Sequence, residues 1–254
     1  MLTILNLLPE LLNVNGDAEN ARVLASRARW SGIEAEVVTD CALTPDLVII
    51  GSGFDGDIEL IAAGMRSVEP QLASAVLRGV PVLAIGLGFE LLGGRVSLAD
   101  GTTVDGLGLI PGHAEPLAER AVGDIVVVST IATLVGYENH GRSYVLDETT
   151  PVLGSVAVGV GNGDAARREG IIVGSVIGSH IHGPLLALNP HLADQMLATA
   201  TNGQYSAANP QARWADSLAA ASRAKVLSAH GLPSETVRRR SQPADKREAA
   251  EWLI

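Results

Sequence analysis

The sequence predicts an α/β fold in which a mostly parallel sheet carries helices on both faces and is joined by an additional β-rich section. Short apolar runs of strand length alternate with longer segments whose apolar residues recur at helical spacing. This alternation supplies the crossover connections that parallel strands need. After about residue 94, β-rich runs separated by Gly, Asn and Asp predict shorter, partly antiparallel strands.

The elements of the first half follow from these apolar patterns. The expected order is a strand at 2–8, a helix at 17–31, strands at 34–38 and 45–51, a single helix at 57–79 and a strand at 82–85. In the second half, GDIVVVS, SVAVGVG and GIIVGSVIG indicate strands, and GNGD at 161–164 is typical of a hairpin turn. Helical spacing returns at 190–201 and 208–229.

Composition and charge limit the possible functions. The 254 residues are 47% hydrophobic, enough for a sizeable core, and a net charge of −10 disfavours a general nucleic-acid binder. Residues 213–254 carry eight basic and five acidic side chains, which we interpret as a solvated helical face rather than a docking surface. No leader pattern or run of about 18–20 apolar residues is present, so we expect a cytoplasmic protein without a transmembrane segment.

Two glycine loops follow predicted strands. GSGFDG at 51–56 fits G-x-G-x-x-G, but it follows the third strand and no acidic residue ends the next one, so a dinucleotide site is disfavoured. GLGFEL at 86–91 follows the strand VLAI and precedes a short apolar helix, which is the strand–turn–helix geometry of a nucleophile elbow. No nucleophilic side chain stands on this turn.

Histidines gather near a later strand end. GSHIHGPLL places His180 and His182 two positions apart, at the edge of the sheet where active sites of α/β proteins lie. A His-x-His pair can bind a metal, but no third ligand is evident nearby, so we predict no metal and no other cofactor.

Together these segments resemble a known family. PVLAIGLGFELLG resembles the elbow Cys-Gly-Gly-Tyr-Gln-Leu-Leu-Gly of class I glutamine amidotransferases of the cobyric acid synthase branch, and GSHIHGPLL is similar to their Gly-Thr-Tyr-Leu-His-Gly-Pro. The resemblance is closest to the GatD-type glutaminase subunits of lipid II isoglutaminyl synthase, which work with a Mur-ligase-like subunit, MurT. It implies a flavodoxin-like amidotransferase domain over 1–205 and leaves 206–254 as a C-terminal helical extension.

The resemblance implies a vacant nucleophile position. His182 corresponds to the family's catalytic histidine, and Gly86 stands where the family has its nucleophilic cysteine. Amide hydrolysis through a thioester needs a thiolate, which glycine cannot supply. The single cysteine, Cys41, lies before the third strand and away from the elbow, so we do not expect it to substitute.

The resemblance also implies residues that bind substrate. Gly53, or its neighbour, matches the loop residue that supplies an oxyanion-hole amide, and Arg120 matches an arginine of the glutamine pocket. Leu87 and Glu90 replace a glycine and a glutamine of the family pattern. We expect Glu90 to place a negative charge in the pocket, which disfavours a ligand carboxylate and favours a cation.

The first hypothesis is therefore a catalytically silent GatD-like subunit that acts as partner or scaffold of a MurT-like Mur ligase in peptidoglycan precursor amidation. One alternative is an active glutaminase subunit, with the nucleophile missing only from this version of the chain or the reaction taking another route. Another is a module that binds glutamine or another small ligand in the former glutamine pocket, with an anion held at the helix N-terminus after Gly86.

Overall fold

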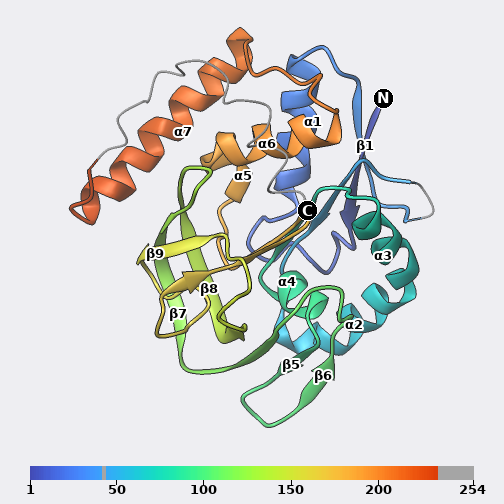
Figure 1. The fold of residues 1–254 in the computed structure, drawn as a ribbon, viewed down its shortest axis with the longest axis vertical. Coiled ribbons are helices and arrows are strands. Elements are labelled where there is room, and N and C mark those ends of the chain that lie inside the picture. Colours follow the sequence, from blue (N-terminus) through green and yellow to red (C-terminus); the bar gives the residue numbers. More distant parts are fainter. Residues whose placement is uncertain (42–43, 234–254) are drawn as a thin grey trace.

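A six-stranded sheet forms the centre of the computed structural model, which describes residues 1–41 and 44–233 (Figure 1). Its strands, in spatial order, are β2 (Ala35–Val38), β1 (Leu2–Leu7), β3 (Leu47–Ile50), β4 (Val82–Ile85), β12 (Val176–Ser179) and β11 (Ile171–Val173). All pairs are parallel except β11 with β12. The five parallel strands have the flavodoxin-like order 2-1-3-4-5, so the predicted fold class is confirmed.

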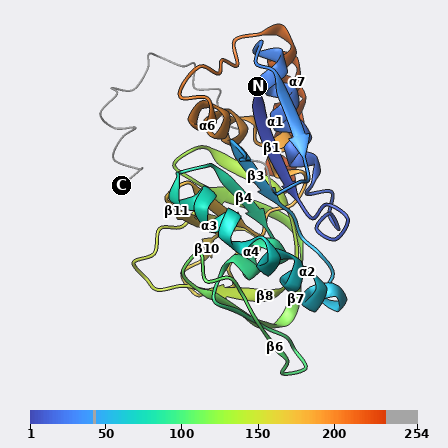
Figure 2. The same ribbon diagram turned by 90° about the vertical axis from the view of Figure 1, so that its right-hand side faces the viewer.

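Helices cover both faces of this sheet (Figures 1 and 2). One face carries α1 (Glu19–Trp30), α5 (Leu185–Leu188) and α6 (Pro190–Ala200), and the other carries α2 (Ile58–Ser67), α3 (Glu69–Leu77) and α4 (Leu87–Leu92). Side chains of the strands alternate between the two cores: Ile49 faces α1 and α6, whereas Val48 and Ile50 face α2 and α3. Both cores are fully apolar at their centres, which explains the nearly uninterrupted apolar strands.

The single helix expected over 57–79 is wrong, because the chain forms two helices there. A short 3-10 turn, η1 (Asp55–Asp57), leads into α2, and the break falls at Val68. Pro70 lies in the first turn of α3, where its missing N–H costs no hydrogen bond. Inside a continuous helix the same proline would remove one, so the chain starts a new helix instead.

A second sheet lies beyond the carboxyl ends of the first. Its strands are β5 (Arg95–Ser97), β6 (Thr103–Asp105), β7 (His113–Val128), β8 (Thr133–Val145), β9 (Gly154–Val158) and β10 (Arg168–Glu169). The partly antiparallel pairing was expected, but the lengths of β7 and β8 were not. These strands reach 16 and 13 residues because a register shift between Pro116 and Ala121 lets the pairing continue past the proline.

The C-terminal part begins with α7 (Pro210–Ala229), close to the predicted bounds. Asn209 caps it by accepting the Ala212 N–H, and Arg27 of α1 binds Asp216 of α7 at 2.8 Å and Asp194 of α6 at 2.6 Å. The rest of the predicted extension, residues 234–254, lies outside the described residues. In the described part of the chain no helix is long and apolar enough to cross a membrane.

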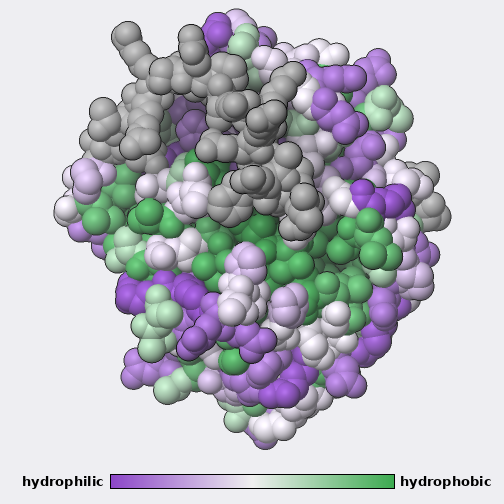
Figure 3. Space-filling view, viewed as in Figure 1, coloured by the Kyte–Doolittle hydropathy of each residue, from purple (hydrophilic) through white to green (hydrophobic). Residues whose placement is uncertain are grey.

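Hydrophobic residues gather across the middle of the face seen in Figure 3. At the β11–β12 edge of the first sheet, a groove of about 550 Å³ opens between these strands and α6. Ile172, Ile177 and Met196 contribute to its lining, together with polar residues such as Gln195. The groove is therefore mixed in character, and it lies apart from the four loops described next.

Candidate functional site

Four loops meet at the carboxyl edge of the parallel sheet. They follow β1, β3, β4 and β12 and carry Asp17, Ser52, Gly86 and His182. In sheets of this order, ligands bind at the carboxyl ends of the strands, near the point where strand order reverses. The fold alone thus brings together residues from four distant parts of the sequence.

Gly86 forms the turn between β4 and α4, as the elbow pattern predicts. Its backbone has φ +53° and ψ −124°, a conformation that residues with a side chain adopt only under strain. The Gly86 N–H donates to the Ser179 carbonyl at 2.9 Å, which ties the turn to β12. A Cβ atom built on residue 86 would lie 3.1 Å from His182 Cε1, so the imidazole faces the elbow.

His182 is held by a carboxylate that the sequence analysis did not identify. Its Nδ1 lies 3.0 Å from both oxygens of Asp17, and both residues are completely buried. The charge of Asp17 fixes the imidazole with Nδ1–H donating and the lone pair on Nε2, the arrangement of a general base oriented by an acid. The base-and-acid half of a hydrolytic triad is therefore present.

The Nε2 atom of His182 does not face a nucleophile. It lies 3.3 Å from the Asn15 side-chain amide, which donates to it, and Tyr137 of β8 packs beside the imidazole ring. Asn15 also accepts from Asn139, whose side chain and carbonyl both bind Arg120. Arg120, assigned by resemblance to the glutamine pocket, thus reaches His182 only through two asparagines.

The glycine pairs of the two loops are explained by close packing. A Cβ on Gly51 would collide with the Leu12 carbonyl, and one on Gly88 would collide with the Gly51 carbonyl. The two G-x-G turns therefore pack backbone against backbone, which is a structural reason for both motifs. Gly53 is also crowded, since a Cβ there would lie 2.9 Å from the Leu11 carbonyl and even closer to Ile61.

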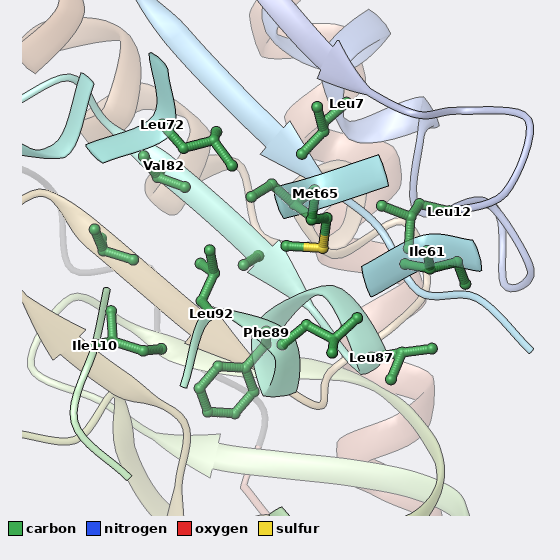
Figure 4. Packing of buried hydrophobic residues seen from close by; sticks show 14 of the residues in the cluster. Leu7, Leu12, Ile61, Met65, Leu72, Val82, Leu87, Phe89, Leu92 and Ile110 are labelled. Atoms are coloured by element: carbon green, nitrogen blue, oxygen red, sulfur yellow. The ribbon is translucent and has the colours of Figure 1, made fainter. Parts of the chain in front are cut away.

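Leu87 and Glu90 of α4 lie in different surroundings. The Leu87 side chain lies in the apolar core with Ile61 and Met65 of α2 (Figure 4), so it does not crowd the elbow. Glu90 is completely buried, and its carboxylate accepts from Arg142 Nε at 2.7 Å. The effect of this charge on a ligand stays a prediction, and in the structure β8 places the Arg142 guanidinium directly against the carboxylate.

The electrostatics of Glu90 follow from these partners. Burial alone would raise its pKa, but hydrogen bonds from His180 and Arg142 and the charge of Arg142 hold the pKa at about 2. Burial lowers the pKa of His180 to about 4, so neutral His180 donates from Nε2 to Glu90 at 3.3 Å. Arg142 also binds Asp55 at 2.8 Å, which ties the loop after β3 to β8.

His180 and His182 do not form a joint metal site. His180 stacks on His140 with ring centroids 4.1 Å apart, whereas His182 faces Asp17 and Tyr137. Across residues 1–41 and 44–233, no three His, Cys, Asp or Glu side chains are grouped to hold a metal ion. Each histidine has its own buried partner instead.

Cys41 lies away from these loops. It is partly buried and lines a small cavity with Leu5, Leu72 and Ala75, on the α3 side of the sheet. Burial raises the pKa of its thiol, with Asp40 adding to the effect, so the thiolate is disfavoured. Its position and its chemistry both argue against a role at the elbow.

The site geometry agrees with a family match over most of the chain. Residues 3–190 match the CobB/CobQ-like glutamine amidotransferase domain. The chain belongs to this family. The resemblance seen in the elbow and histidine segments is thereby confirmed at the level of the family.

Two relatives show which members of the family this chain is similar to. The chain is 34% identical over 210 residues to the GatD subunit of lipid II isoglutaminyl synthase (glutamine-hydrolyzing) from Staphylococcus aureus (strain N315), covering 78% of this chain and 84% of that protein. It is 32% identical over 217 residues to the same subunit from Streptococcus pneumoniae (strain ATCC BAA-255 / R6), covering 80% and 82%. This amidotransferase is therefore GatD-like.

Solved structures support the fold. A crystal structure of a glutamine amidotransferase aligns with a TM-score of 0.55 at 19% identity, covering 78% of this chain and 98% of that one. A chain of the PurLQS structure from Thermotoga maritima aligns with a TM-score of 0.54 at 18% identity, covering 80% and 97%. At such identities the likeness concerns architecture alone.

Three site residues escaped the sequence analysis: Asp17, Ser52 and Asn15. Each lies in a loop that directly follows β1 or β3. Their position directly after these strands is the sequence feature that points to a site, because the carboxyl ends of neighbouring parallel strands converge. By this criterion the polar residues of NVNGDAEN, which follows the first strand, are candidate site residues.

Proposed function

We propose that this GatD-like chain is a catalytically silent subunit that serves as partner or scaffold of a Mur-ligase-like enzyme in the amidation of a peptidoglycan precursor. The observation that carries the proposal is the elbow itself. Gly86 occupies the turn after β4 in a nucleophile's backbone conformation, yet it offers no side chain. Acyl transfer cannot begin without a nucleophile, however well the base is oriented.

The surroundings of His182 support the proposal that this chain does not hydrolyse glutamine. The Asn15 side-chain amide donates a hydrogen bond to its Nε2 atom. The single cysteine, Cys41, packs against the apolar core on one face of the sheet, whereas Ile181, next to His182, belongs to the core on the other face. Without a side chain on Gly86, this base would have to activate water or a group from elsewhere in the chain. Loss of one triad member ordinarily removes most of the rate, so we expect no useful glutamine hydrolysis.

The partner in this proposal comes from the relatives. Both are named as GatD subunits of lipid II isoglutaminyl synthase, and the chain covers more than four fifths of each. An α/β domain can offer the roughly 800 Å² of an ordinary interface without using its active site.

Ammonia release tests the silent part of the proposal. The purified chain, alone or with its ligase partner, is incubated with glutamine and compared with a heat-treated sample. We expect no ammonia above that control, because Gly86 has no nucleophile and Cys41 is remote. The matched variants are Cys41→Ala and His182→Ala.

Turnover that survives Cys41→Ala and disappears with His182→Ala would contradict the proposal. It would favour the active-subunit alternative, with the His182–Asp17 pair activating another nucleophile. Tight binding of glutamine by a chain that forms no ligase complex would favour the small-ligand module instead. The proposed anion site for that module lacks support, because α4 is only six residues long.

A further inference from the structure

Ser52 is fixed at a position that no role assigned above explains. It is only 7% exposed, and its N–H donates to Asp17 Oδ2 at 3.2 Å. Its carbonyl accepts from the Val14 N–H at 3.0 Å. Both ends of the residue are therefore held by the loop after β1, so the direction of its side chain is fixed.

The Ser52 hydroxyl oxygen accepts a hydrogen bond from a backbone amide that acyl transfer would need. Ser52 Oγ accepts the Leu87 N–H at 3.1 Å, within the buried part of the turn. In strand–turn–helix elbows the amide that follows the nucleophile donates to the oxyanion of the tetrahedral intermediate. Here an oxyanion would first have to displace a hydroxyl oxygen that belongs to the protein.

Ser52 also fills the space that a side chain on residue 86 would take. A Cβ atom on residue 86 would lie 2.5 Å from Ser52 Oγ and 2.8 Å from Ser52 Cβ. Rotation about χ1 can move the hydroxyl away, but it leaves Cβ where it is. Carbon atoms in contact prefer about 3.5–4.0 Å, so the conflict with Ser52 Cβ persists in every rotamer.

We propose that Ser52 closes the acyl-transfer site of this chain: its hydroxymethyl group fills the volume of an elbow side chain, and its oxygen takes the Leu87 amide. The inference deepens the proposed function and rests on it, because it identifies a second obstacle to glutamine hydrolysis beside Gly86. It also implies that Gly86 and Ser52 are complementary. A thiol can be accommodated at position 86 only when the Ser52 side chain is removed.

The test is a set of variants in a Cys41→Ala background, so that the introduced thiol is the only one. The set comprises Gly86→Cys, Ser52→Gly/Gly86→Cys and Ser52→Ala/Gly86→Cys, with Ser52→Gly as the single control. Ser52→Ala removes the hydroxyl but keeps the Cβ atom at 2.8 Å, whereas Ser52→Gly removes both. The readouts are the thermal midpoint and the rate of alkylation by iodoacetamide.

We expect Gly86→Cys alone to lower the thermal midpoint by about 5 °C, the shift typical of an overpacked site in a chain of this size. Adding Ser52→Gly should recover more than half of that loss and raise the alkylation rate at least tenfold. Ser52→Ala should recover little of the midpoint, since the Cβ conflict remains. The strain of a positive φ is common to all three cysteine variants, so it cancels in the comparison.

Equal midpoints and equal alkylation rates for Gly86→Cys and Ser52→Gly/Gly86→Cys would overturn the inference. Glutamine hydrolysis by the unmodified chain that is lost in Ser52→Gly would also overturn it, since the hydroxyl would then be a nucleophile. That hydrolysis result would contradict both proposals, whereas the remaining measurements distinguish them. Ligase binding decides the scaffold role, whereas melting and alkylation report on Ser52 whether or not a ligase binds.

Discussion

The pair formed by Glu90 and Arg142 shows how a residue near the elbow acquires its charge state. Glu90 lies on α4, four positions after Gly86, yet it faces β8 and not the imidazole of His182. A completely buried carboxylate is costly unless a cation and hydrogen bonds compensate it. Arg142 and His180 provide both, which explains why an acidic residue is tolerated on an otherwise apolar helix.

We predict that Arg142→Met lowers the free energy of unfolding by about 3–5 kcal/mol at pH 7, because it leaves Glu90 charged and buried without its cation. In the intact protein the pKa of Glu90 is depressed to about 2 from an ordinary 4.5. Its stabilising effect is therefore complete above pH 4.5 and is lost as the pH falls toward 2. Urea unfolding at pH 7, 5 and 3 should show the difference between the two proteins shrinking in acid.

The control is Arg95→Met, which removes the exposed partner of Glu115. An exposed ion pair contributes about 0–1 kcal/mol, so this variant should be nearly as stable as the parent. A loss for Arg142→Met that stays constant from pH 7 to pH 3 would contradict the assignment of that loss to ionised Glu90.

At the scale of elements, a buried arginine attaches α7 to the domain. Arg27 of α1 is 3% exposed and binds Asp194 of α6 and Asp216 of α7, while Tyr205 donates to the same Asp194. One guanidinium thus joins three helices. The second attachment is apolar, where Leu227 of α7 packs against Val126 and Val135 of the second sheet.

We predict that Arg27→Ala loosens α7 while leaving the parallel sheet intact. Two aspartates would lose their shared cation, a change that costs about 3 kcal/mol at a buried position. Hydrogen exchange should become at least tenfold faster in α7 and stay nearly unchanged in β3 and β4. Arg22→Ala on the same helix is the matched control, because Arg22 is exposed and pairs only with Glu19 in the described contacts.

Uniform acceleration of exchange in Arg27→Ala, with β3 and β4 affected as strongly as α7, would show that this arginine supports the whole domain. The extension over 206–254 would then not be a separate unit. The domain division thus remains a prediction that this experiment can decide for the described part, which ends at residue 233.

At the scale of the whole molecule, charge is unevenly distributed along the chain. The net charge is −10, yet residues 213–254 carry eight basic and five acidic side chains. A basic segment on an acidic body speeds the approach of an acidic partner, and salt screens this effect over about 10 Å at 0.1 M. Charge therefore bears on the rate of assembly more than on its final strength.

We predict that co-expression with a Mur-ligase-like protein from the same genome yields a stable heterodimer at micromolar concentration. Deleting residues 234–254 should slow association slightly more at low salt than at high salt, since it removes five basic and four acidic side chains and makes the chain more negative by one unit. Size-exclusion chromatography and stopped-flow association measure the two effects. Separate species in chromatography would remove the scaffold role, and a salt-independent rate change would exclude steering by this segment.

The sequence by itself determined the fold class and the family. Apolar periodicity is a local property, so β1, α1, β3 and β4 were predictable from spacing alone. The elbow and histidine segments are contiguous as well, which is why Gly86 and His182 could be identified from the order of residues alone. Local patterns failed where distant pairing decides, as in the long strand β7, or where one proline divides α2 from α3.

Only the tertiary structure decided what faces the elbow. Asp17 and His182 are 165 positions apart, and Ser52 and Leu87 are 35 apart, yet each pair shares a hydrogen bond. The cation beside Glu90 could not be named from the sequence, because Arg142 comes from a strand of the second sheet, 52 positions away. Strand order and register determine these contacts, and the residue pattern of a single segment predicts neither. The side chains come together only because separate parallel strands end at a common edge of the sheet.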